Sequence, residues 1–178
     1  KPFKVQLFAG HMHYNRNMIH SDNFYEHNTG AISGAWWQGN YCLDGTPLGY
    51  GVYEIDGTEI TWYFKSVEHD RMHQMRVYAP NTTRLYDKDV VVNIWNWDKN
   101  WRVEWHENGV KMGEMTRFEG LDPEVEKDYS DKEKLEFNWI APIKTDHMFR
   151  ATPVKQDSEI TIVAIDPFDN VYVETISR

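Results

Sequence analysis

The chain has 178 residues, enough for one large domain or two small ones with a buried core. Its formal net charge of −9, from 28 acidic and 19 basic residues, argues against general nucleic-acid binding, which needs Lys and Arg in place of phosphate counterions. No stretch approaches the roughly 18 apolar residues that cross a membrane, and the single Cys42 excludes a disulfide framework.

The composition favours a β-rich protein. Aromatic residues make up 15% of the chain, with 8 Trp and 10 Tyr, and such side chains suit pleated, half-buried surfaces. The chain starts at Lys1 without an initiator Met or a leader, so we expect a processed or excised piece of a longer protein.

The first elements alternate between apolar and polar composition. Residues 5–9 form a short apolar run that ends at Gly10, which predicts a buried strand entering a loop. Residues 11–28 are polar and predict a long, irregular loop. Residues 30–37 predict a strand of small residues.

A hairpin follows. Residues 50–55 and 59–64 flank Asp56-Gly57, a dipeptide that accepts positive φ and suits a tight turn. Ile60, Trp62 and Phe64 alternate with more polar residues, as in a strand with one buried face. A further strand is expected near residues 75–79.

The second half shows short strands with regular turn signals, typical of an antiparallel sandwich of the immunoglobulin or fibronectin class. Trp101, Val103 and Trp105 share one face and predict core. Asp122-Pro123 predicts the N-cap and start of a two-turn helix. The predicted strands are residues 90–97, 101–107, 110–118, 147–152, 160–165 and 171–176. We place a domain boundary near residue 85, giving domains 1–85 and 86–178.

A histidine pair follows the first strand, in Gly10-His11-Met12-His13. In extended backbone, residues i and i+2 project to the same side, so both imidazoles can face one site and ligate zinc, iron or manganese. By spacing alone, an ordinary pair of polar loop residues is the more common outcome. The chain contains no DxH, GDxxD or GNH[DE] element that would complete a metal site.

Longer sequence segments around and beyond the histidine pair resemble a known family. Gly-His-x-His after an apolar strand resembles the closing motif of the calcineurin-like metallophosphoesterases, and the longer run at residues 7–17 resembles a secreted, Bacteroidetes-type subgroup. Further similar strings span nearly the whole chain: residues 25–28, 34–37, 44–47, 49–53, 74–78 and 145–150. The fold implied is the terminal strands of the phosphoesterase domain followed by a β-sandwich.

The resemblance implies a hydrolase with two divalent metal ions (Mn, Fe or Zn), with His11 a ligand to one ion and His13 a ligand to the other. The other ligands would lie upstream, in a missing N-terminal catalytic domain. We therefore expect this chain alone to bind no metal and to lack activity on a phosphoester substrate. Family resemblance also implies a periplasmic, extracellular or cell-surface location.

Four further residues are candidates for contacting substrate. Asn15 and Arg16 follow the histidine pair, and the Arg16 fork could pair with a phosphate oxygen, although an exposed loop Arg is the plainer interpretation. Trp36 and Trp37 could line the cleft or seal the interface with the missing domain. The alternative function is a glycan- or ligand-binding β-sandwich module that travels with an enzyme, based on the cluster Trp95, Trp97, Trp101 and Trp105.

Overall fold

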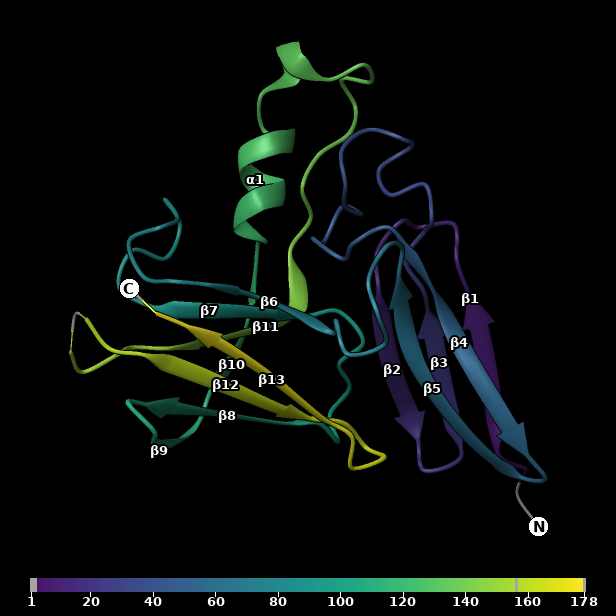
Figure 1. Cartoon of the computed structure of the whole chain (residues 1–178). Coiled ribbons are helices and arrows are strands. Elements are labelled where there is room, and N and C mark those ends of the chain that lie inside the picture. The colour runs from purple at the N-terminus through teal and green to yellow at the C-terminus, as the bar shows by residue number, and fades with distance from the viewer. Residues whose placement is uncertain (1–2, 156, 178) are drawn as a thin grey trace.

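The computed structural model describes residues 3–155 and 157–177, and these form a mainly β molecule, as predicted. Figure 1 shows two parts side by side: an N-terminal part with a small sheet and a long hairpin, and a sandwich with a short helix above it. The N-terminal strands are β1 (Val5–Ala9), β2 (Arg16–Ser21), β3 (Phe24–Asn28), β4 (Gly49–Asp56) and β5 (Glu59–Ser66).

The small sheet has the order β1-β3-β2, with β1 parallel to β3 and β2 antiparallel to it. The irregular loop expected over residues 11–28 is therefore wrong, because most of it is the β2–β3 hairpin. Its polar composition concealed the alternation. Tyr25, His27 and Asn28 are the buried positions of β3, and His27 Nε2 lies 2.7 Å from Gln6 Oε1.

Strand β1 lies where it was predicted, but it is not buried. Phe8 packs its ring edge-on to Tyr53 of the β4–β5 hairpin, with the ring centroids 4.5 Å apart. Val5 and Leu7 alternate to the opposite face and are 47% and 44% exposed. One face of the small sheet is thus covered by the hairpin, and the other presents apolar side chains to solvent.

The β4–β5 hairpin is confirmed. The strands pair from Gly49↔Ser66 to Asp56↔Glu59, so the two turn residues are Gly57 and Thr58, one position beyond the predicted Asp56-Gly57. Trp62 and Phe64 are buried, as their alternation indicates. The hairpin therefore packs its inner face on the small sheet.

The 29–48 loop, which joins β3 to β4, contradicts the strand predicted at residues 30–37. It consists of turns with two isolated bridges, Ala35↔Gln38 and Tyr41↔Pro47. Gly34, Trp36 and Trp37 have φ of 51°, 56° and 60°, in the left-handed region that an extended strand cannot use. A Cβ on Gly34 would lie 2.7 Å from the Tyr41 carbonyl oxygen, so only glycine fits there.

The sandwich consists of two four-stranded antiparallel sheets, with orders β10-β11-β7-β6 and β13-β12-β8-β9. The core between them includes Val92, Trp101, Trp105 and Ile162, so the predicted core face of residues 101–105 is confirmed. The strands are β6 (Met75–Tyr78), β7 (Val90–Ile94), β8 (Arg102–Glu107), β9 (Val110–Glu114), β10 (Thr116–Gly120), β11 (Thr145–Ala151), β12 (Ile160–Ile165) and β13 (Val171–Ile176).

The single strand predicted over residues 110–118 is wrong, because the chain changes sheets there. β9 pairs with β8 in one sheet, and β10 pairs with β11 in the other. Gly113, with φ of 132°, permits the bend, and Met115 is buried in the core between the two strands. Strands β9 and β10 therefore form one continuous segment that runs from one sheet to the other at this edge of the sandwich.

The predicted helix is confirmed as α1 (Pro123–Tyr129), with the Asp122 side chain accepting from the Glu124 and Val125 backbone N–H groups. A short 3₁₀ turn, η1 (Lys132–Lys134), follows. Val125 and Tyr129 pack with Ala35 and Ile140 in a second cluster, so α1 and the segment after it lie against the 29–48 loop (Figure 1).

The sandwich includes a strand that lies ahead of residue 85, because β6 pairs with β7 over Met75↔Ile94 to Tyr78↔Val91. The sheet thus begins at Met75. The division into domains 1–85 and 86–178 stays a prediction.

Candidate functional site

The histidine pair lies in the turn directly after β1. His11 and His13 have φ of 74° and 56°, so the extended backbone assumed from the sequence is absent at these two residues. Left-handed φ is uncommon outside glycine and, when held in place by surrounding contacts, is often found at functional sites. His11 is exposed and His13 is half-buried.

Contacts from the 29–48 loop hold the His13 ring. Its Nδ1 hydrogen-bonds the Gly34 carbonyl oxygen, and the ring stacks on Trp36 with centroids 3.9 Å apart. A carbonyl oxygen only accepts, so Nδ1 carries the proton and the Nε2 lone pair is left for a ligand. Metal-binding histidines are oriented in this way by a carbonyl or carboxylate.

The pair fits a metal ion in chemistry but not in number. Neutral imidazoles suit Zn, Fe or Mn, whose sites take about four to six ligands. Among residues 3–155 and 157–177, no group of three or more His, Cys, Asp or Glu could hold a metal ion. His11 and His13 could therefore supply two ligands of a site that other residues complete.

Asn15 and Arg16 have different surroundings. Asn15 is buried: its backbone N–H donates to Asp44 Oδ2 at 2.7 Å, and its Oδ1 accepts from the Gly30 N–H at 2.5 Å. It thus ties the histidine turn to the 29–48 loop. Arg16 is exposed at the start of β2 and lines a cavity of about 220 Å³ with Glu119. Substrate contact by either residue stays a prediction.

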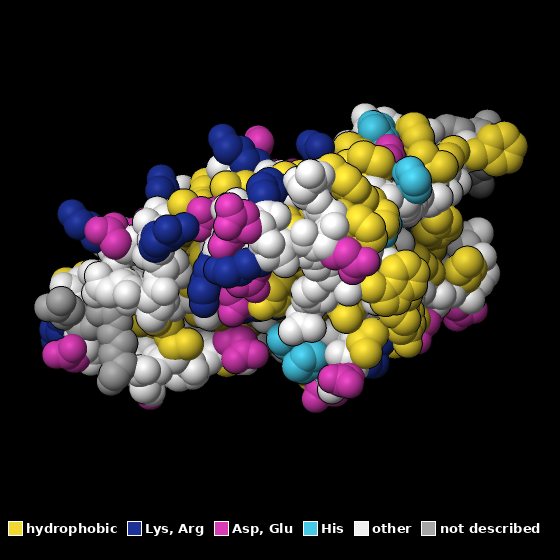
Figure 2. Space-filling model, turned by 90° about the horizontal axis from the view of Figure 1, so that it is seen from above, with side chains coloured by type: hydrophobic (Ala, Val, Ile, Leu, Met, Phe, Trp, Pro, Cys, Tyr) yellow, Lys and Arg dark blue, Asp and Glu magenta, His cyan; other side chains and the backbone are white. Residues whose placement is uncertain are grey.

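Tryptophans surround the histidine pair on one side. Trp36 lies between the His13 ring and the Trp139 ring, whose centroid is 4.5 Å away and nearly perpendicular. Trp37 is 85% exposed and Trp139 is 56% exposed. Figure 2 shows hydrophobic side chains, with histidines among them, gathered over the half of the molecule that carries the N-terminal part. Sequence reasoning missed Trp139, because nothing in its local pattern links it to residue 36.

A buried polar network fixes the loop beneath the pair. The Asp44 carboxylate is fully buried and accepts from the Asn15 N–H, the Thr46 N–H and the Thr46 hydroxyl. His147 of β11 adds a contact, with Nε2 at 3.1 Å from Asp44 Oδ2. The network connects the histidine turn to the sandwich.

The network also contacts both nitrogens of the His147 ring. The Asn93 amide nitrogen donates to the Asp44 carbonyl oxygen and to Asp122 Oδ2, so Asn93 Oδ1 faces His147 Nδ1 at 2.7 Å. Both ring nitrogens of His147 therefore face oxygen atoms, which fixes the ring between β7 and the 29–48 loop. Residues 44 and 147 lie in strings that carried the family resemblance, which was the available signal for them.

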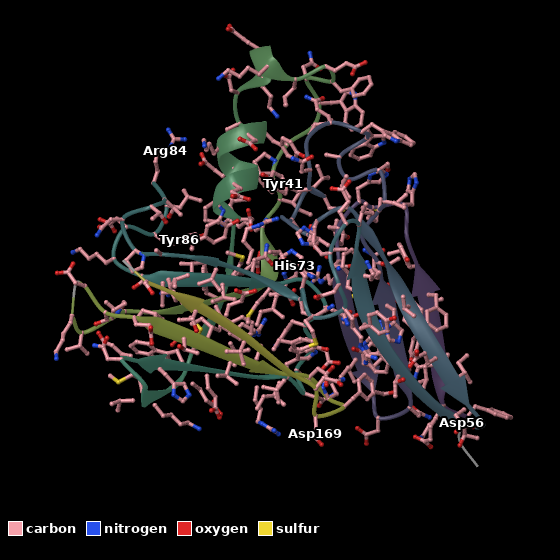
Figure 3. All side chains as sticks on the ribbon, viewed as in Figure 1. Tyr41, Asp56, His73, Arg84, Tyr86 and Asp169 are labelled. Carbon is pink, nitrogen blue, oxygen red and sulfur yellow. The ribbon has the colours of Figure 1, made fainter. Side chains whose placement is uncertain are left out.

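Aromatic and basic side chains fill the junction between the two parts of the molecule. Arg76 of β6 lies over the Tyr41 ring at 4.8 Å and donates to the Gly45 carbonyl oxygen at 3.0 Å. Tyr41 and His73, labelled in Figure 3, lie near the middle of the molecule. The His73 ring packs against Trp95 and is half-buried.

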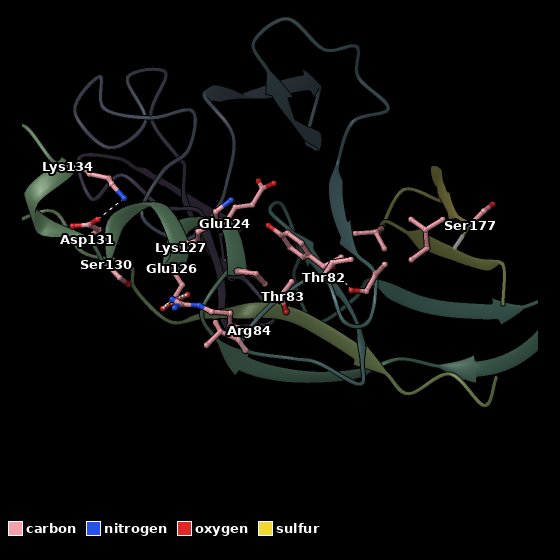
Figure 4. Close-up of a pocket in the computed structure, with 16 residues that line it drawn as sticks. Thr82, Thr83, Arg84, Glu124, Glu126, Lys127, Ser130, Asp131, Lys134 and Ser177 are labelled. Atoms are coloured by element: carbon pink, nitrogen blue, oxygen red, sulfur yellow. Dashed lines mark hydrogen bonds and ion pairs between the residues drawn. The ribbon is translucent and has the colours of Figure 1, made fainter. Parts of the chain in front are cut away.

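A cavity of about 1060 Å³ lies away from the histidine pair, between α1 and the loop after β6 (Figure 4). Four of its charged side chains form two ion pairs, Arg84 with Glu126 at 3.2 Å and Lys134 with Asp131 at 2.8 Å. None of the metal- or substrate-binding residues predicted from the sequence lines it.

The tryptophans of the sandwich offer no exposed platform. Trp95, Trp101 and Trp105 are buried, and Trp97 is half-buried beneath the guanidinium of Arg117. In the described residues, no helix has the length and apolar character needed to cross a membrane.

The chain is a β-sandwich joined to a small sheet. The turn after the first strand of that sheet carries His11 and His13, and the His13 ring is fixed by contacts with Gly34 and Trp36. The family model described as the C terminal of calcineurin-like phosphoesterase matches residues 26–172, and the chain belongs to this family. His11 and His13 lie just ahead of the matched range. Neither the curated proteins nor the solved structures gave a match.

Proposed function

We propose that the chain is the C-terminal part of a metal-dependent phosphoesterase, in which His11 and His13 are ligands to two divalent ions. The observation that carries this proposal is the His13 ring, oriented by the Gly34 carbonyl with Nε2 free, beside an exposed His11. When bound, such ions polarise a phosphoryl group and supply a hydroxide near neutral pH. The chain's own part is to hold the two imidazoles in place.

The missing ligands belong, in this proposal, to an N-terminal catalytic domain, which the family description implies. The solvent-facing side of the small sheet suits such a partner, because Val5 and Leu7 of β1 are exposed there and the histidine turn follows the same strand. Both side chains are available to pack against another domain.

His11→Ala and His13→Ala in the full-length enzyme test the proposal. Each is expected to lower bound Mn, Fe or Zn, measured by elemental analysis, and to cut turnover of a phosphate monoester or diester by several orders of magnitude. His20→Ala on strand β2 of the same sheet, also an exposed histidine, is the matched control and should keep both metal content and turnover. Full metal content and turnover in both pair variants would overturn the proposal.

Export to the periplasm or cell surface belongs to the same proposal and rests on the family resemblance alone. Fractionation of cells that produce the full-length protein checks it. Recovery of the protein in the cytoplasmic fraction only would contradict it.

A further inference from the structure

Two tryptophans beside the histidine pair keep large exposed ring surfaces. Trp37 follows Trp36 in the chain, and Trp139, about a hundred residues further on, packs its ring edge-on against Trp36, which itself stacks on His13. Burying a Trp ring removes 150–250 Å² of mostly apolar surface from water. Rings left 85% and 56% exposed at this place form an available contact surface.

The surface is held rigidly. The Trp37 N–H donates to the Ser33 carbonyl at 2.6 Å, and the Tyr129 hydroxyl donates to the Gln38 carbonyl at 2.7 Å. Trp36 and Trp37 both have positive φ, a conformation costly for bulky residues, and these bonds maintain it. Backbone strain retained beside a candidate site is typical of a built binding surface.

The Trp139 side of the surface is fixed to the same loop. The Phe137 N–H donates to Gln38 Oε1, and the Phe137 ring stacks on Trp139 with centroids 5.7 Å apart. Trp139 is therefore placed by its own segment rather than by chance proximity. The exposed ring surface carries no charge, so its preferred ligand is flat and apolar.

We propose that Trp37 and Trp139 form an aromatic wall that contacts the organic group of the phosphoester, and that this group is a planar aromatic ring. This inference rests on the proposed function, because the histidine pair beside the wall positions the phosphoryl group. Trp36 connects the wall to the histidine pair, because its ring packs against Trp139 and stacks on His13. Aryl esters and nucleotides share the required chemistry.

The test compares variants of the full-length enzyme on phenyl phosphate, a nucleoside 5′-monophosphate and glycerol 2-phosphate. Trp37→Ala and Trp139→Ala are expected to lower kcat/KM about tenfold to a hundredfold for aromatic esters, the size of a lost ring stack, and to leave the glycerol ester unchanged. Trp139→Phe should restore much of the loss. A loss confined to one aromatic ester identifies the source of the ring as aryl or nucleobase.

Phe3→Ala is the control, since Phe3 is an exposed aromatic ahead of β1, at the end of the strand opposite the histidine turn. Equal losses on all three esters would overturn the proposal, because they would mean that the tryptophans only position the histidine turn. Unchanged kinetics on all of them would overturn it as well.

Saturation-transfer NMR separates this inference from the proposed function. Wild-type protein should transfer saturation to the ring protons of phenyl phosphate, and the Trp37→Ala, Trp139→Ala double variant should not. Binding without turnover would contradict the phosphoesterase proposal while supporting the wall. If the wild-type protein transfers no saturation to the ring protons of phenyl phosphate, the aromatic wall is refuted.

Discussion

Asp44 shows most directly how single residues position the site. Its buried carboxylate accepts from Asn15, Thr46 and His147, and replacing it with Asn puts an amide group against these donors, so that buried donors lose their acceptor. We expect Asp44→Asn to lower the free energy of unfolding by about 3 kcal/mol. Denaturant titration measures this.

Asp56→Asn is the matched control, because Asp56 is exposed at the β4–β5 turn (Figure 3) and should change stability by no more than about 0.5 kcal/mol. Equal stability of the two variants would refute the assigned role of the network.

His27 predicts a pH dependence of stability. Burial lowers the pKa of its ring from 6.5 to about 4 in the folded protein, and its Nδ1 is buried without a hydrogen-bond partner. Between these values the unfolded chain binds a proton that the folded chain does not, so stability falls as pH drops through this window. His73, with a pKa lowered to about 4 by burial, acts in the same direction.

His27→Phe keeps an aromatic ring beside Tyr25 and removes the titrating group. At pH 5, the uptake of protons on unfolding should fall by about one, obtained from the slope of unfolding free energy against pH. The same slope in both proteins would count against a neutral, buried His27.

At the scale of elements, two glycines allow the cost of a positive φ to be compared with the cost of a steric clash. Gly34 and Gly57 both have positive φ, but a Cβ on Gly57 meets nothing within 4 Å, whereas on Gly34 it meets the Tyr41 carbonyl oxygen at 2.7 Å. Gly57→Ala should cost about 1 kcal/mol from φ alone. Gly34→Ala should cost clearly more, and it should displace the carbonyl that orients His13.

Thermal unfolding of both variants measures the difference, and the metal content of the full-length enzyme reports the effect on His13. If Gly34→Ala and Gly57→Ala lower stability by the same amount, the 29–48 loop can move to accommodate the added Cβ, which contradicts the prediction.

Elements with strong local signals were predictable from sequence. The β4–β5 hairpin, the Asp122 cap of α1 and the core face of β8 follow from turn residues, capping residues and alternation. The β2–β3 hairpin was missed because buried His27 and Tyr25 find their partners in tertiary contacts. Residues 30–37 were mistaken for a strand because small residues also permit left-handed turns.

For the whole molecule, the family and the mainly β class were accessible from sequence, but the assembly of the candidate site was not. Trp139 reaches Trp36 only because α1 and its following segment pack on the 29–48 loop. Likewise, the Asp44–His147 contact joins residues 103 positions apart. Such pairs depend on how the sandwich sits against the N-terminal part, which no local pattern encodes.

Two backbone hydrogen bonds give this arrangement a mechanical consequence. The Ile143 N–H donates to the Leu43 carbonyl, and the Leu43 N–H donates to the His13 carbonyl, at 3.0 and 2.9 Å. The stretch that bears the indole of residue 139 is thereby tethered to the chain that bears the imidazole. A displacement of the segment that carries Trp139 is therefore transmitted through the backbone of Leu43 to the backbone of His13.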